Sequence, residues 1–113
     1  MEKNLEKRTK QFSLAIIKFT ALLPRNREVD ILARQLLRSG TSIGANYREA
    51  NRGVSRPDFT NKIGIVQKEA SETQYWLELL IESGVLKNPP TELQREATEL
   101  LAIFTAIGKK LKE

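Results

Sequence analysis

The chain has 113 residues, of which 40% are hydrophobic and 29% are charged, a balance typical of a globular domain. It contains no cysteine and no histidine, which excludes disulfides, thiolate nucleophiles and the commonest general base and transition-metal ligand. We therefore expect a single domain over residues 1–113 that is not an enzyme. We expect no catalytic residue, no cofactor, no metal site and no small-molecule substrate.

The hydrophobic residues are not gathered into a membrane span. The longest apolar stretches, residues 14–17 and 76–81, are far shorter than the roughly 20 residues needed to cross a bilayer. The first ten residues mix acids with bases and precede no apolar core with a small-residue cleavage site, so no secretory signal is expected. These features predict a cytoplasmic protein without a membrane partner.

Two amphipathic helices are predicted in the first half of the chain. The first runs from about Lys3 to Leu23 and ends at Pro24, because proline prevents the preceding helix from continuing. The second runs from about Arg27 to Gly53. The apolar residues at helical spacing in the first helix are Leu5, Phe12, Ala15, Ile16, Phe19, Leu22 and Leu23.

Two glycines, Gly40 and Gly44, lie on one flank of the second predicted helix. Glycine inside a helix costs about 1 kcal/mol relative to alanine. The pair therefore indicates a close approach of a neighbouring backbone or a bend in the helix.

Two further helices are predicted in the second half. Ser55 is a plausible cap for the third, which Ser83 and Gly84 end, and Thr91 is the cap candidate for the fourth. Their inward residues are Phe59, Ile63, Val66, Ala70, Thr73, Leu77 and Leu80, then Leu93, Ala97, Leu100, Phe104, Ile107 and Leu111. Four helices joined by short turns predict an all-α, up-down antiparallel four-helix bundle.

A stripe of arginines follows the second predicted helix, opposite its apolar side. On a helical wheel they fall within about 80°, and they are Arg34, Arg38, Arg48, Arg52 and Arg56. Guanidinium groups suit phosphate, and residues 1–56 carry twelve basic and five acidic side chains, against seven and nine in residues 57–113. This arginine stripe is a candidate nucleic-acid site; the alternative is an ordinary solvated helix face.

The third predicted helix has a second apolar side. Such a side is buried against another chain or against neighbouring helices of its own bundle, and large aromatic residues favour an interface. Glu69 and Glu72 flank it and are placed to pair with arginines of the stripe, within or between subunits. The candidate oligomer interface comprises Ile65, Glu69, Glu72, Tyr75, Trp76 and Leu79.

Several long motifs carry a family resemblance. The segment from Arg38 to Ala50, RSGTSIGANYREA, is one, and the segment from Lys68 to Leu77, KEASETQYWL, is another. With Asp58-Phe59, Lys62 and the Pro24 turn, they resemble the four-helix-bundle proteins encoded within intervening sequences of bacterial 23S rRNA genes, also called S23 ribosomal proteins. The resemblance implies a homopentamer. It implies no particular activity.

Two hypotheses for function follow. The first is a non-enzymatic homo-oligomer that binds structured RNA through the arginine stripe, by charge rather than by base readout. The alternative is a protein-interaction adaptor or scaffold that does not bind nucleic acid. A salt titration separates them, because phosphate binding weakens steeply as counterions are released.

Overall fold

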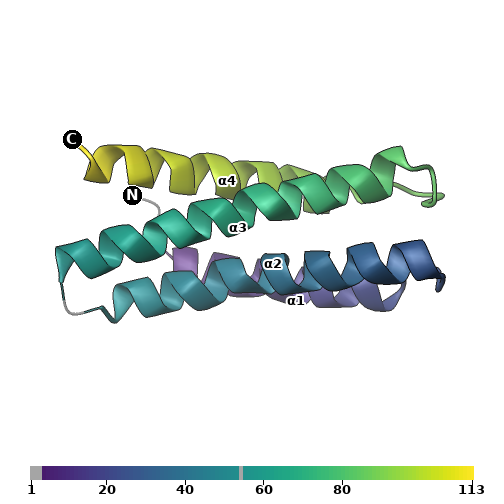
Figure 1. Ribbon diagram of the computed structural model, residues 1–113, viewed down its shortest axis with the longest axis horizontal. Helices are drawn as coiled ribbons and strands as arrows, with labels where there is room; N and C mark the ends of the chain where they lie inside the picture. The colour runs from purple at the N-terminus through teal and green to yellow at the C-terminus, as the bar shows by residue number, and fades with distance from the viewer. Residues whose placement is uncertain (1–3, 54) are drawn as a thin grey trace.

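The part of the protein that the structure describes folds into four α-helices that run alternately up and down a long bundle. The computed structural model describes residues 4–53 and 55–113. In chain order the helices are α1 (Leu5–Ala21), α2 (Arg27–Asn51), α3 (Arg56–Glu82) and α4 (Thr91–Leu111). Each lies against its neighbours in sequence, and α4 closes the bundle against α1 (Figure 1). The predicted all-α, antiparallel four-helix bundle is confirmed.

Most helix ends follow the predicted signals. The Ser55 side chain accepts a hydrogen bond from the Asp58 backbone N–H at 3.2 Å, and Pro57 occupies the first turn of α3. Gly84, just beyond α3, has a φ of 80°, a left-handed conformation that glycine adopts without steric cost. The chain therefore reverses at the predicted places.

Several predicted boundaries differ from the structure by one or two residues, including the end of the first helix, which was expected near Leu23 and is Ala21. The prediction placed Thr91 as the N-cap of α4. In the structure the N-cap is Pro90, no side chain makes a capping hydrogen bond there, and Thr91 is the first residue of the helix. The second helix was expected to reach Gly53, but α2 ends at Asn51. Because Ser55 starts a new helix so soon afterwards, Arg56 lies in α3 rather than in line with the arginines of α2.

The core is made where the apolar sides of all four helices meet. The predicted inward residues of α3 and α4 are largely buried, with Phe104, Leu77 and Leu100 fully so. In α1 the prediction partly fails, because Leu22 follows the end of the helix and is 86% exposed, and Ala15 is also exposed. Thr9 is buried instead, and its hydroxyl donates to the Leu5 carbonyl oxygen at 2.9 Å.

The two glycines of α2 allow α1 to approach closely. A Cβ atom at Gly44 would lie 3.3 Å from the carbonyl carbon and oxygen of Thr9. One at Gly40 would lie 2.9 Å from Cγ1 of Ile16, which is closer than real Cβ contacts. The predicted close approach is therefore present, between α1 and α2.

Candidate nucleic-acid interface

The arginine stripe does not form one continuous charged surface, because its members have different partners. Arg38 donates to Glu69 Oε1 at 3.1 Å and to Glu72 Oε1 at 2.7 Å, both on α3 of the same chain. Partial burial lowers the pKa of the Arg38 guanidinium, but the adjacent Glu69 and Glu72 carboxylates outweigh it and raise the pKa overall. Arg38 is therefore neutralised within the subunit.

Arg48 and Arg52 share a single carboxylate on α1. The Glu6 oxygens lie 3.8 Å from Arg48 Nε and 3.4 Å from Arg52 Nη1, and they accept a 2.9 Å hydrogen bond from Asn51. The two arginine side chains remain 54% and 64% exposed. Two guanidinium groups beside one carboxylate leave an excess of positive charge at this point of the surface.

The contacts of the Glu6 carboxylate predict how the stability of the fold changes at acidic pH. The hydrogen bond from Asn51, aided by Arg52 and Arg48, holds the pKa of the Glu6 carboxyl below its ordinary value. A carboxyl whose pKa is lower in the folded state stabilises the fold above its unfolded pKa, and that contribution is lost as the pH falls through the folded pKa. Replacing Glu6 by glutamine removes this dependence.

We therefore expect the melting temperature of the wild type to fall more steeply than that of Glu6→Gln on acidification below about pH 4. Circular dichroism melts across this range measure the difference. Glu113→Gln, at an exposed position, is the control and should follow the wild type. Parallel curves for the wild type and Glu6→Gln would contradict the expectation.

Arg34 lies in a shallow groove between α1 and α2. Among residues 4–53 and 55–113 it has no ion-pair partner, and it lines a depression of about 420 Å³ together with Ile17 and Leu37. Farther along the same pair of helices, Lys10 and Arg48 line a second depression of about 400 Å³, together with Glu6 and with Glu49, which pairs with Lys62 of α3. The cations of this surface therefore come from two helices.

Arg56 belongs to a different surface. Its Nη2 donates to the Leu111 carbonyl oxygen at 3.3 Å, which connects the first turn of α3 with the last turn of α4. The wheel that grouped Arg56 with the other four arginines assumed an unbroken helix. The break between α2 and α3 separates it from them.

The second apolar side of α3 is present but only partly exposed. Tyr75 is 52% and Ile65 38% exposed, whereas Trp76 and Leu79 are partly buried. Trp76 packs against the core of its own bundle, and its indole N–H is buried without a hydrogen-bond acceptor among the described residues. The two glutamates of the candidate interface, Glu69 and Glu72, pair with Arg38 within the chain.

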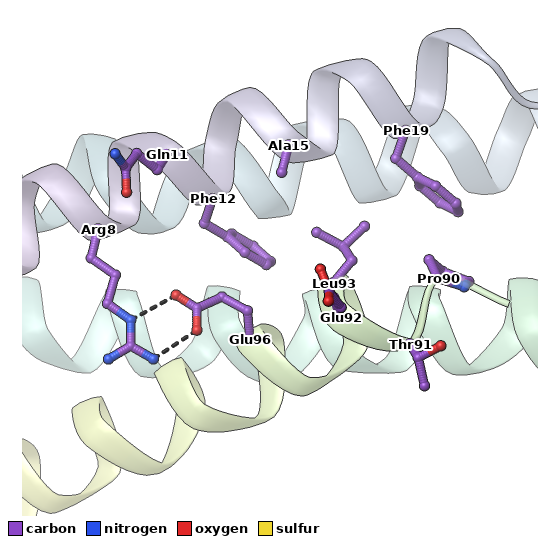
Figure 2. Close-up of a pocket in the computed structure, with 10 residues that line it drawn as sticks. All are labelled: Arg8, Gln11, Phe12, Ala15, Phe19, Pro90, Thr91, Glu92, Leu93 and Glu96. Carbon is purple, nitrogen blue, oxygen red and sulfur yellow. Dashed lines mark hydrogen bonds and ion pairs between the residues drawn. The ribbon is translucent and has the colours of Figure 1, made fainter.

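A groove of about 540 Å³ opens between α1 and α4, the pair of neighbouring helices that pack most loosely. Phe12 and Phe19 of α1 and Leu93 of α4 line it, and Arg8 closes one end through two 2.6 Å hydrogen bonds to Glu96 (Figure 2). Its lining is mainly apolar. Of its charged residues, Arg8 and Glu96 are paired with each other, and Glu92 also lines the groove.

The described part of the chain contains no cluster of three or more His, Cys, Asp or Glu side chains suited to a metal ion. Within that same part, no helix is long and apolar enough to cross a membrane.

The fold and its charges define a small four-helix-bundle protein with surplus positive charge between two of its helices. The chain belongs to the 23S rRNA-intervening sequence protein family, whose model matches residues 2–106. It is similar to a protein with unknown function from the S23 ribosomal protein family of Bacteroides thetaiotaomicron VPI-5482. That crystal structure is 38% identical, with a TM-score of 0.83, over 92% of this chain and 97% of the other. No curated protein matches the chain.

Proposed function

We propose that the protein binds structured RNA through the phosphate backbone, on a surface we call the α1/α2 basic face: Lys10, Arg34, Arg48 and Arg52. The observation that carries this proposal is the sharing of Glu6 by Arg48 and Arg52, which leaves positive charge uncompensated. Exposed ion pairs stabilise a fold only weakly. A phosphate group therefore displaces the Glu6 carboxylate from these arginines at little cost.

The shape of the face suits a nucleic-acid backbone. At about 1.5 Å per residue, Arg34 and Arg52 are separated by roughly 27 Å along α2, which is enough to contact several phosphates. Lys10, Arg34 and Arg48 lie on α1 and α2, and Arg52 is the residue that directly follows α2. They contact charge rather than base edges, so binding is expected to depend strongly on salt and weakly on sequence.

The test compares two double variants that remove the same charge. Arg48→Gln with Arg52→Gln should weaken binding to an RNA hairpin, and the slope of log affinity against log salt should become shallower by about two units. Fluorescence anisotropy with a labelled hairpin at several salt concentrations measures both. Arg27→Gln with Arg38→Gln is the matched control, because each of these arginines has its own carboxylate partner.

Equal losses in the two double variants would assign binding to net charge and reject the α1/α2 basic face. No binding by the wild type at low salt would reject RNA binding altogether. In that case the alternative is a protein-interaction adaptor. The observation that favours it is the neutralisation of Arg38 by Glu69 and Glu72 of α3, the helix that also exposes Tyr75.

We also propose that the protein assembles into a homo-oligomer, a pentamer by its family resemblance, through the exposed apolar side of α3. The support from the structure is the exposure of Tyr75 and Ile65 on one helix. Repeating the α1/α2 basic face around an assembly would raise avidity by about 10² to 10⁴ without any new contact. Weak binding by one subunit would then be sufficient.

A further inference from the structure

A small apolar slot lies between the first turn of α3 and the last turns of α4, two segments that lie at the same end of the bundle (Figure 1). Its volume is about 400 Å³, and it is lined by Phe59 from the first turn of α3 and by residues of the last turns of α4. These are Ala106, Ile107, Lys110 and Leu111. A slot of this size is within the range of small-ligand sites.

The slot exists because the apolar sides of α3 and α4 continue to the end of the bundle. Phe59 and Leu111 occupy the terminal positions of the two inward sides, and both are only partly buried. Deeper in the same helices, Ile63 and Phe104 are fully buried. Phe59 therefore remains partly accessible, in contrast with Ile63 one turn further along α3.

One basic residue, Lys110, lines the slot, and others lie near it in the sequence. Arg56 binds the Leu111 carbonyl oxygen with one nitrogen, and its guanidinium has further N–H donors to offer. Four cationic side chains lie within residues 56–59 and 109–113, namely Arg56, Lys109, Lys110 and Lys112. The same segments carry two carboxylate side chains, Asp58 and Glu113, which leaves a net charge of +2. An occupant of this slot should therefore be flat or apolar on one side and anionic beside it.

We propose that this slot holds an unpaired nucleobase of single-stranded nucleic acid, stacked on Phe59, with its phosphate on Arg56 and Lys110. Aromatic rings beside basic side chains are how proteins hold single strands, and stacking tolerates any base. A base in a duplex cannot enter, because it is paired and stacked within the helix. The slot therefore selects unpaired strands, and this inference rests on the proposed binding of RNA.

The test is Phe59→Leu, which keeps an apolar side chain and removes the ring. Affinity for a labelled oligouridine should fall about tenfold, while affinity for a blunt RNA duplex of equal length stays unchanged. Phe19→Leu, the same substitution in a partly buried phenylalanine at the opposite end of the bundle, should change neither affinity. Circular dichroism verifies that both variants remain folded. Ultraviolet crosslinking of bound oligouridine should label the peptides containing Phe59 or Lys110.

If Phe59→Leu does not change the affinity for oligouridine, or if crosslinks form only in other peptides, the proposal that the slot binds a base is rejected. The proposal that the α1/α2 basic face binds RNA is not affected by that result. An equal loss in Phe59→Leu and Phe19→Leu would also overturn it, as a general effect on the fold. Absence of wild-type binding to both RNAs would reject the slot and the proposed function together. Arg48→Gln with Arg52→Gln distinguishes the two sites, because it should weaken binding to both the duplex and the single strand.

Discussion

Replacing Phe104 by alanine is expected to lower the free energy of unfolding by about 3–5 kcal/mol. The Phe104 side chain is completely buried in α4, and its ring meets the ring of Tyr47 edge to face, with centroids 5.2 Å apart. Alanine removes the apolar contacts and the aromatic pair, and it leaves a cavity between α2 and α4. Domains of this size are typically stable by about 5–15 kcal/mol, so the loss is a large part of the total.

Urea denaturation followed by circular dichroism measures this change. Phe104→Leu is the control, since it retains most of the buried volume and should cost about 1–1.5 kcal/mol. Nearly equal midpoints for Phe104→Ala and the wild type would show that this position is not in the core. A loss in Phe104→Leu as large as in Phe104→Ala would assign the effect to the ring pair with Tyr47 rather than to volume.

The sequence predicted the helices well because the apolar spacing of each helix is a local property of the chain. The inward residues of α3 between Ile63 and Leu77 recur every three or four residues, and the prediction that they share one buried side of the helix is confirmed. Boundaries were less predictable. Leu22 continues the apolar spacing of α1, but the helix ends at Ala21, so Leu22 projects from the turn into solvent.

The charged surface was harder to predict, because ion pairs form between helices. A wheel drawn for one helix cannot show that Arg38 reaches Glu69 on α3, whereas Arg48 turns toward Glu6 on α1. It also hides Lys10, which joins Arg48 only when α1 packs against α2. Gly40 and Gly44 were the available signal in the sequence, because they indicated that another helix packs closely on this side of α2. In the structure that helix is α1, which supplies Glu6 and Lys10.

Assembly is expected to be lost when charge is placed on the exposed apolar side of α3. Tyr75 and Ile65 are the apolar residues of the candidate interface that are most exposed relative to their size, whereas Trp76 already packs against its own core. Ile65→Glu with Tyr75→Glu should therefore leave the monomer fold intact. It should destroy the interface, because a carboxylate buried against a neighbouring subunit without a partner is strongly unfavourable.

Light scattering measures the mass of the wild type and of this variant, and each mass is compared with the 12.9 kDa of one chain. The wild type should have the mass of five chains and the variant the mass of one, with equal helix content by circular dichroism. Ala102→Glu with Thr105→Glu introduces the same two charges at exposed positions of α4 and should remain assembled.

A monomeric wild type would reject self-association, and a wild-type dimer or tetramer would reject the pentamer but keep the interface. If both glutamate pairs dissociated the assembly, the added charge itself would be responsible, and Tyr75 and Ile65 would lose their special role. If neither did, subunits would have to meet through another surface, and the apolar residues exposed between α1 and α2, Ile17 and Leu37, would be the next to test.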